Sequence, residues 1–264
     1  MGAWSVSILW GYLDMSITIL LDGDINAYKA ASAVETVACV DEGLGLYTWY
    51  ASLPDSIDHL TKQMEFIKKT YQPSRIIFAL TDPGENWRKA VLPTYKSNRT
   101  KTKKPLVLKK LREYIKEKYE VMQRPGLEGD DVLGILATSK SLIEGPAIVV
   151  TDDKDLKTIP CQLARMDEDV CIVSEKEADY NHMFQTLTGD TTDGYKGCPG
   201  VGPKKATEIL FDNPTNVWGA VVKTFEKAKL TEADALVQAR VARICRASDY
   251  DFQAQRVKLW EPNI

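Results

Sequence analysis

The sequence Leu-Glu-Gly-Asp-Asp at residues 127–131 and the sequence Val-Val-Thr-Asp-Asp-Lys-Asp at residues 149–155 decide the fold. The first opens a helix that has acids in its first turn, and the second ends an apolar strand in a group of aspartates. Like charges at close range must either take up protons or share a cation. We therefore expect these carboxylates to share divalent metal ions.

The other potential ligands disfavour a soft metal site. The chain has two histidines, His59 and His182, and five cysteines that include no Cys-x-x-Cys pair, so a structural zinc site is not expected. Ligation by oxygen alone points to Mg²⁺ or Mn²⁺. Cysteines scattered without a disulfide framework also fit a reducing cytoplasm.

Two earlier strands also end in acids. The apolar run at residues 17–21 leads into Asp22-Gly23-Asp24, and the run at residues 75–80 precedes Asp82. One aspartate at a strand end is usually structural, but three successive strands that end this way favour a site. Such strand ends meet at one edge of a parallel sheet, where ligands bind in open α/β folds. The prediction is an α/β fold with a mostly parallel central sheet flanked by helices.

Hydrophobic periodicity and breaker residues predict the remaining elements. We expect helices at residues 25–37, 55–71, 106–119, 128–142 and 177–187, an edge strand at 120–123, and a glycine-containing loop at 41–54. Asp55 is expected to cap the second of these helices.

Charge is unevenly distributed along the chain. The net charge is −3, yet the segment from Arg88 to Lys118 holds twelve Lys or Arg and two Glu, which leaves −13 for the remainder. Such a segment suits a polyanionic substrate, although residues 109–118 alone fit a solvated helix. The part flanked by Pro93 and Pro105 lacks an apolar period, so we expect a mobile basic loop or short helices; a disordered surface loop is the alternative. The candidate DNA contacts here are Arg88, Lys89, Tyr95, Lys101, Lys103 and Lys104.

A second candidate for DNA contact is Gly200-Val201-Gly202-Pro203, followed by Lys204 and Lys205. Glycines allow a tight turn with outward N–H groups, proline suits a first helical turn, and the lysines stand where a phosphate would approach. We interpret Gly200, Gly202, Lys204 and Lys205 as a helix-hairpin-helix that holds the DNA backbone; an ordinary turn is the alternative. Arg240, Arg243 and Arg246 are expected on a solvated helix face.

The length of 264 residues allows a core and a smaller second region. We expect an α/β core at 15–175 with a basic arch at about 86–105, and a helical region at 176–264 with the helix-hairpin-helix at about 190–211. Residues 1–14 are expected to be an extension before a start at Met15. A signal peptide or membrane span is not expected, since no Lys or Arg precedes the apolar stretch at 4–21 and no cleavage-like site follows it.

Five motifs in order carry a family resemblance. They are Asp-Gly-Asp at 22–24, Tyr-Lys-Ser-Asn-Arg at 95–99, the acidic sequence at 127–131, Asp-Lys-Asp-Leu-Lys-Thr-Ile-Pro at 153–160 and Gly-Asp-Thr-Thr-Asp-Gly-Tyr at 189–195. From about Ile19 to Trp260 the chain resembles the flap endonuclease and 5′→3′ exonuclease superfamily, especially the stand-alone 5′→3′ exonucleases of short-tailed T-odd bacteriophages. The resemblance implies a PIN-like or resolvase-like nuclease core, a short basic arch and a C-terminal helix-hairpin-helix (H3TH) motif.

The resemblance also implies a two-metal nuclease that uses Mg²⁺ or Mn²⁺. By position, Asp22, Asp82, Glu128 and Asp130 match ligands of one metal, Asp131, Asp153, Asp155 and Asp193 surround the second with support from Asp190, and Asp130 would bridge. Lys96 and Arg99 match catalytic basic residues of the arch. The segment from Gly200 to Lys205 matches a motif that in relatives also binds a monovalent cation such as K⁺.

The implied substrates are 5′ ends, nicks or flaps in duplex DNA, during phage replication, recombination or host DNA breakdown in the cytoplasm of the infected cell. RNA primers in RNA–DNA hybrids and replication proteins as partners remain open. No membrane partner is implied.

Two other functions compete with this one. In a phosphatase of the haloacid dehalogenase type, Asp22 and Asp24 would be the nucleophile and acid, and the aspartates at 152–155 would bind magnesium. That reading leaves the basic segment and the glycine hairpin without a purpose. A non-catalytic DNA-binding module explains those two features but not the carboxylates.

Overall fold

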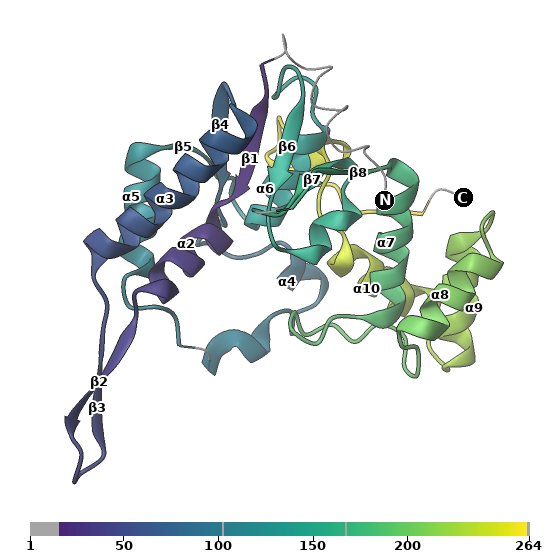
Figure 1. Cartoon of the computed structure of the whole chain (residues 1–264). Coiled ribbons are helices and arrows are strands. Elements are labelled where there is room, and N and C mark those ends of the chain that lie inside the picture. The colour runs from purple at the N-terminus through teal and green to yellow at the C-terminus, as the bar shows by residue number, and fades with distance from the viewer. Residues whose placement is uncertain (1–15, 102, 167, 263–264) are drawn as a thin grey trace, which may run out of the picture.

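The computed structural model describes residues 16–101, 103–166 and 168–262. Within them, the central sheet has six strands in the order β5-β4-β1-β6-β7-β8 (Figure 1). All neighbouring strands are parallel except β7 and β8. This confirms the predicted α/β fold with a mostly parallel sheet. The strands are β1 (Thr18–Asp22), β4 (Arg75–Ala79), β5 (Glu120–Met122), β6 (Ala147–Val150), β7 (Cys161–Ala164) and β8 (Cys171–Val173).

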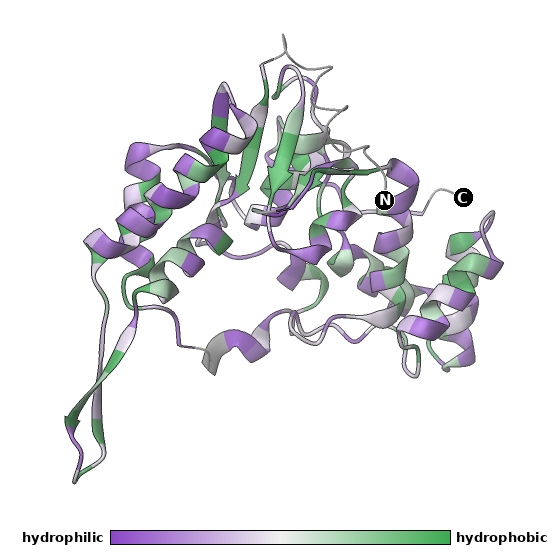
Figure 2. Ribbon diagram, viewed as in Figure 1, coloured by the Kyte–Doolittle hydropathy of each residue, from purple (hydrophilic) through white to green (hydrophobic). Residues whose placement is uncertain are grey.

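Helices cover both faces of this sheet, which is why its strands are apolar throughout rather than alternating. Along β1, Ile19 and Leu21 point to one face and Leu20 to the other. Figure 2 shows hydrophobic central strands between helices with hydrophilic outer sides. One face carries α2 (Gly23–Ala33), α3 (Leu53–Tyr71) and α5 (Leu108–Lys118), and the other carries α6 (Gly129–Thr138).

The C-terminal region is helical and has a third apolar cluster around Leu187, Val221 and Phe225. It is also joined to the sheet, because Ile244 and Cys245 belong to the core beneath α6. A division near residue 175 therefore remains a proposal. The helices are α7 (Glu175–Thr188), α8 (Pro203–Asp212), α9 (Val217–Lys227) and α10 (Glu232–Ala242), followed by the short strands β9 (Tyr250–Asp251) and β10 (Arg256–Val257).

The basic stretch forms short helices, which was one of its predicted forms. They are α4 (Arg88–Val91) and the 3-10 helix η1 (Ser97–Lys101). Two further 3-10 helices are η2 (Lys154–Thr158) and η3 (Ala247–Asp249).

Three predicted helix boundaries were wrong. The helix α3 begins two residues before Asp55, and its cap is Ser52, whose hydroxyl accepts a hydrogen bond from Asp55 N at 3.3 Å. The helix α6 ends at Thr138, before the predicted residue 142. The helix α2 ends at Ala33, and the chain then turns into a strand.

An antiparallel hairpin stands where the sequence predicted the end of a helix and a loop. It consists of β2 (Thr36–Asp41) and β3 (Leu46–Tyr50), and it projects away from the core in Figure 1. Both of its faces are exposed, so its sequence lacks the alternation that marks a half-buried strand. The available signal was the enrichment in aromatic and β-branched residues.

No helix in the described ranges is long and apolar enough to span a membrane. The predicted extension at residues 1–14 and the start at Met15 lie outside those ranges.

Candidate active site

The ends of β1 and β6 bring two aspartates together. Asp22 is the last residue of β1 and is buried; its Oδ1 accepts a hydrogen bond from Ile25 N at 2.9 Å, so it caps α2. Its Oδ2 accepts from Thr151 Oγ1 at 3.0 Å, and that hydroxyl in turn accepts from Asp153 N at 3.0 Å. Thr151 thus ties the two strand ends to each other. We did not single out this threonine from the sequence, although its place directly before the aspartates was the available signal.

The charges of these residues act on Asp130, in the first turn of α6. Burial raises the pKa of Asp130 well above its ordinary value, and the charges of Asp22, Asp153 and Glu128 raise it further. Burial, together with the charges of Asp24 and Asp153, raises the pKa of Asp22 to about 6. Side chains from three separate segments therefore share one space and repel one another.

A second acidic group adjoins the first. Burial and the charges of Asp153, Asp190 and Asp193 raise the pKa of Asp155 to about 6. Gln185 on α7 donates to Asp155 Oδ1 at 2.7 Å, and this is another contact that the sequence did not suggest. Asp190 accepts from the backbone of Thr192 and Asp193. The loop after α7 thus carries its acids to the strand ends.

Cationic residues of the basic stretch reach the same place. Lys96 Nζ pairs with Glu128 Oε1 and lies 3.4 Å from Asp193 Oδ2, while Arg99 pairs with Asp193. The hydroxyl of Tyr95 lies 2.8 Å from Glu128 Oε2 and 2.9 Å from Asp193 Oδ2. The side chain of Tyr95 is buried and supports these two carboxylates, which does not favour its predicted role as a DNA contact.

Arg88 and Asp131, predicted as a DNA contact and a metal ligand, form a buried ion pair with each other. Two guanidinium nitrogens of Arg88 donate to the two oxygens of Asp131 at 2.7 and 2.8 Å. Trp87 Nε1 and Cys245 N also donate to Asp131, each at 3.0 Å. Burial would raise the pKa of Asp131, but the charge and hydrogen bonds of Arg88 hold it below its ordinary value. In this structure Arg88 is buried and both oxygens of Asp131 accept hydrogen bonds from the protein, which does not favour their predicted roles at DNA and metal.

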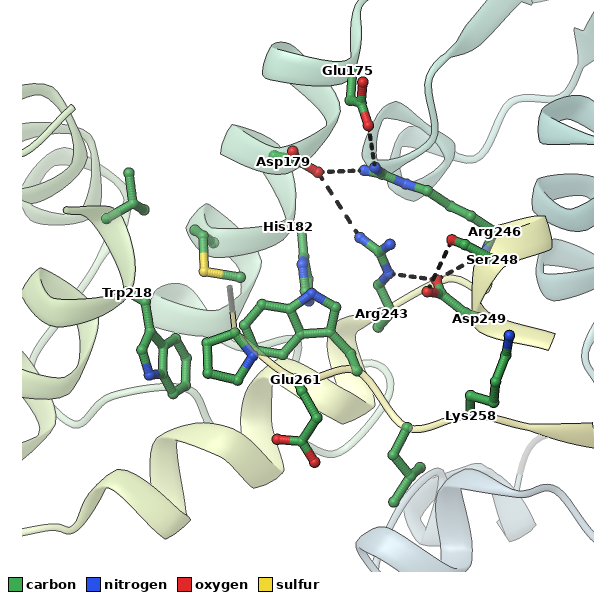
Figure 3. A pocket seen from close by; sticks show the side chains of 15 residues that line it. Glu175, Asp179, His182, Trp218, Arg243, Arg246, Ser248, Asp249, Lys258 and Glu261 are labelled. Atoms are coloured by element: carbon green, nitrogen blue, oxygen red, sulfur yellow. Dashed lines mark hydrogen bonds and ion pairs between the residues drawn. The ribbon is translucent and has the colours of Figure 1, made fainter. Parts of the chain in front are cut away.

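The backbone at the end of α10 belongs to the same arrangement. Arg88 donates to the carbonyls of Val241 and Arg243 at 2.9 and 2.7 Å. We had predicted that Arg243 and Arg246 lie on a solvated helix face, but their side chains are buried. They line a cavity of about 440 Å³. Figure 3 shows them turned toward acids of neighbouring elements. Arg243 pairs with Asp249 at 2.8 Å and Arg246 with Asp179 at 2.7 Å. Regular arginine spacing cannot reveal such partners.

The remaining predicted residues lie as follows. Asp82, after β4, accepts from Gly126 N at 2.9 Å. Lys89, Lys103, Lys104, Lys204 and Lys205 are exposed; the side chain of Lys101 lies outside the described part of the chain. Gly200 has φ of +73°, and Gly202 caps α8, whose first residue is Pro203. The local geometry predicted for the glycine turn is therefore present.

The donor set fits a hard divalent cation. Asp22, Asp130, Asp153 and Asp155 offer only oxygen, and their mutual repulsion shows that nearby protein cations do not balance them. Within the described ranges, no three His, Cys, Asp or Glu side chains stand in an arrangement that would hold a metal ion as they are. Mg²⁺ does not require such a cage, because it keeps several water ligands and binds through few carboxylates.

Comparison with known proteins identifies the family. A family model described as "5'-3' exonuclease, N-terminal resolvase-like domain" matches residues 18–188. The exonuclease of Escherichia phage T7 is 30% identical over 92% of this chain and 93% of its own, and the exodeoxyribonuclease of Enterobacteria phage T3 is 31% identical over 92% of each. A flap endonuclease Xni of Shewanella halifaxensis is 29% identical over 60% of this chain and 69% of its own.

Solved structures share the fold at low identity. A T5 5′-exonuclease with bound divalent metal ions (zinc) has a TM-score of 0.55 at 15% identity, over 86% of this chain and 93% of its own. A phage T5 flap endonuclease in a complex with DNA and metal ions has a TM-score of 0.59 at 14% identity, over 86% and 88%. Given the family match and the identity to the phage enzymes, the chain belongs to the 5′→3′ exonuclease family.

Proposed function

We propose that this protein is a metal-dependent 5′→3′ exonuclease of the flap-endonuclease type, which hydrolyses phosphodiester bonds near 5′ ends of duplex DNA. One observation carries the proposal: Asp22, Asp130 and Asp153 converge at the strand ends, where Lys96 of the basic stretch also reaches. The names of the phage relatives and the DNA and metal ions in the T5 structure support it.

The proposed metal site is for two Mg²⁺ or Mn²⁺ ions. Its ligands would come from Asp22, Asp82, Glu128, Asp130, Asp153, Asp155 and Asp193, with Asp190 in support. Such ions lower the pKa of a bound water and stabilise the negative charge that develops on the oxygens of the reacting phosphate. The protein itself fixes Asp22 and Asp153 through Thr151, and it fixes Asp155 through Gln185.

Lys96 and Arg99 would act on the scissile phosphate. Both now pair with carboxylates of the site, Lys96 with Glu128 and Arg99 with Asp193. A phosphate that enters between the arch and the strand ends would meet these cations at the position where negative charge develops. The cations and the carboxylates therefore have opposite tasks at one place, a combination that a non-catalytic binding module does not need.

Finer features of the function are also proposals. Lys204 and Lys205 at the start of α8 would hold duplex phosphates, and the turn at Gly200–Gly202 would take a monovalent cation such as K⁺. Nicks, flaps and RNA–DNA hybrids would be substrates, in the host cytoplasm and in company with replication proteins. We also propose a division into an α/β region at residues 15–175 and a helical region at 176–264, in which the second region would hold the duplex and also supply Asp190 and Asp193 to the site.

The first test follows products from a 5′-labelled and a 3′-labelled duplex, with Mg²⁺ and with EDTA. We expect release of mononucleotides or short oligonucleotides from the 5′ end, in Mg²⁺ only. Folded protein that cuts in neither condition, or hydrolysis of a small phosphate ester in place of DNA, would contradict the proposal.

A matched pair of variants tests the site itself. Asp153→Asn should reduce single-turnover cleavage to background while duplex binding persists. Asp152→Asn is the control, because the carboxylate of Asp152 pairs with Lys29 outside the cluster. This variant should keep nearly full activity. Equal loss in both variants would count against the assigned residues.

A further inference from the structure

The hairpin formed by β2 and β3 exposes large apolar side chains that have no role in the proposed cleavage. Tyr47 is 64% exposed, Trp49 50% and Leu44 73%. Figure 2 shows hydrophobic segments along this projecting element. A two-stranded hairpin is marginally stable in water when it stands alone, and exposed apolar patches mark binding surfaces. A binding surface on the hairpin would explain this composition.

Two of the three exposed aromatic side chains of the hairpin lie on the same face, and the third, Tyr50, lies on the opposite face. Opposite residues in the register are Val37 with Trp49 and Cys39 with Tyr47, and side chains alternate along each strand. Tyr47 and Trp49 therefore share one face. We call it the aromatic face.

The aromatic face is turned toward the basic stretch. Lys103 Nζ lies 3.1 Å from the centroid of the Trp49 ring, which is a cation–π contact. Lys103 also pairs with Glu35 at the base of the hairpin, and Leu106 N donates to Glu35 at 2.9 Å. These contacts fasten the hairpin to the end of the arch.

Aromatic rings beside cations are the chemistry that binds single-stranded nucleic acid: bases stack on the rings and phosphates contact the cations. The hairpin itself has no Lys or Arg between residues 36 and 50, and its tip carries Asp41 and Glu42. The acidic tip thus repels phosphates, and Lys103 and Lys104 attract them. A strand whose phosphates lie along these lysines would have its bases beside Tyr47 and Trp49. A basic surface of another protein would suit the acidic tip, but it would not suit the lysines beside the rings.

We propose that the aromatic face of the hairpin binds unpaired bases of a single-stranded DNA tail whose phosphates lie along Lys103 and Lys104. The proposal rests on the proposed function, because the tail is part of the duplex substrate. Its consequence is a preference for duplexes that carry an unpaired tail, with little dependence on the tail sequence, because every base has a face that can stack.

The test measures binding by fluorescence anisotropy in the Asp153→Asn background, so that cleavage does not interfere. The ligands are a blunt duplex and the same duplex with a 5′ or a 3′ tail of about ten nucleotides, within the range of such sites. Tyr47→Ala and Trp49→Ala should each weaken binding of at least one tailed duplex about tenfold, as loss of one stacked base does. Binding of the blunt duplex should change by less than about twofold on the same scale.

Conservative variants and a control separate stacking from folding. Tyr47→Phe and Trp49→Phe keep a ring and should retain tailed-duplex affinity. Leu44→Ser removes an exposed apolar side chain from the turn, outside the paired strands, and should leave affinity unchanged. Photocrosslinking of a bromodeoxyuridine-containing tail should map to residues 36–50.

Equal loss on blunt and tailed duplexes, or no loss on either tailed duplex, would overturn the proposal. Loss of self-association or of a protein partner in the alanine variants, with unchanged tail affinity, would assign the hairpin to protein docking instead. These binding results do not depend on 5′ cleavage. If the protein binds tails through the hairpin but never cuts, the proposed function is contradicted and the proposed tail binding is not.

Discussion

Asp130 and Asp131 are neighbours in the first turn of α6, yet their surroundings are opposite. Asp131 meets Arg88, Trp87 Nε1 and Cys245 N, and its pKa is lowered. Asp130 meets the charges of Asp22 and Asp153, and its pKa is raised well above the ordinary value. Both are acids at a helix N-terminus, where a carboxylate is ordinarily favourable.

The comparison shows how to separate a structural acid from a functional one. The protein supplies every partner of Asp131, so this residue is part of the framework that joins α4, α6 and the segment after α10. It supplies mainly like charges to Asp130, so this carboxyl either takes up a proton or is balanced by a cation from outside the chain. Repulsion that the fold retains indicates a site for a cation.

The largest expected effect separates the two residues by activity and stability. Asp130→Asn should reduce single-turnover cleavage to background and leave the melting temperature in EDTA unchanged or higher, because it removes repulsion. Asp131→Asn should lower the melting temperature, because Arg88 loses its charged partner. If Asp131→Asn instead kept full stability and lost only cleavage, the assignment of Asp131 to the framework would fail.

The next effect concerns the ion pair itself. Arg88→Met leaves Asp131 charged and buried, and should cost about 3–5 kcal/mol of unfolding free energy in urea, as for other broken buried pairs. The double variant Arg88→Met/Asp131→Leu should recover much of this loss, since buried pairs can be replaced by apolar groups of similar volume. Additive losses in the two single variants and the double variant would show that the pair is not coupled.

A smaller effect should appear in the pH dependence of stability. The pKa of Asp22 and of Asp155 is raised from 3.8 to about 6 in the folded protein. The contribution of these groups to the free energy of unfolding is therefore fully present below about pH 4 and is lost as the pH rises through about 6. The loss is roughly 1.4 kcal/mol for each unit by which a pKa is raised. The lowered pKa of Asp131 acts in the opposite direction: its contribution is present above the unfolded pKa of about 3.8 and lost in more acid solution.

Melting curves in EDTA check this pH dependence. Between pH 5 and pH 7 the wild type should lose stability, Asp22→Asn should flatten the slope, and Mg²⁺ should remove the loss because the cation binds the folded carboxylates. A slope that neither Asp22→Asn nor Asp155→Asn alters would contradict the proposed repulsion.

The smallest effect lies on the surface, at the start of α8. Lys204→Ala/Lys205→Ala should weaken duplex binding and reduce the slope of log affinity against log salt by up to about 0.9 for each lost phosphate contact. The single-turnover rate on saturating duplex should hardly change, in contrast to Asp130→Asn. An unaltered salt slope would count against a phosphate contact at this turn.

The parts of the fold that follow a period or a repeated motif were predictable from the sequence. Three apolar runs that each end in an acid predicted parallel strands with carboxylates at one edge, and β1, β4 and β6 have this arrangement. The glycine and proline of the turn before α8 were equally informative, because few residues adopt that backbone. The hairpin of β2 and β3 escaped prediction because an element exposed on both faces has no burial pattern to detect.

The sequence by itself determined which strand ends carry acids and that their ligand chemistry is oxygen. Only the tertiary structure decided which acids are neutralised. Asp130 and Asp131 follow each other in the sequence, and only the fold shows that Arg88 packs against Asp131. In the same way, Arg243 and Arg246 became buried through Asp249 and Asp179, which neighbouring elements present. The physical reason is that the pattern along a chain sets the direction of a side chain within its own element, whereas its partner charge and its distance from water depend on the elements that fold against it.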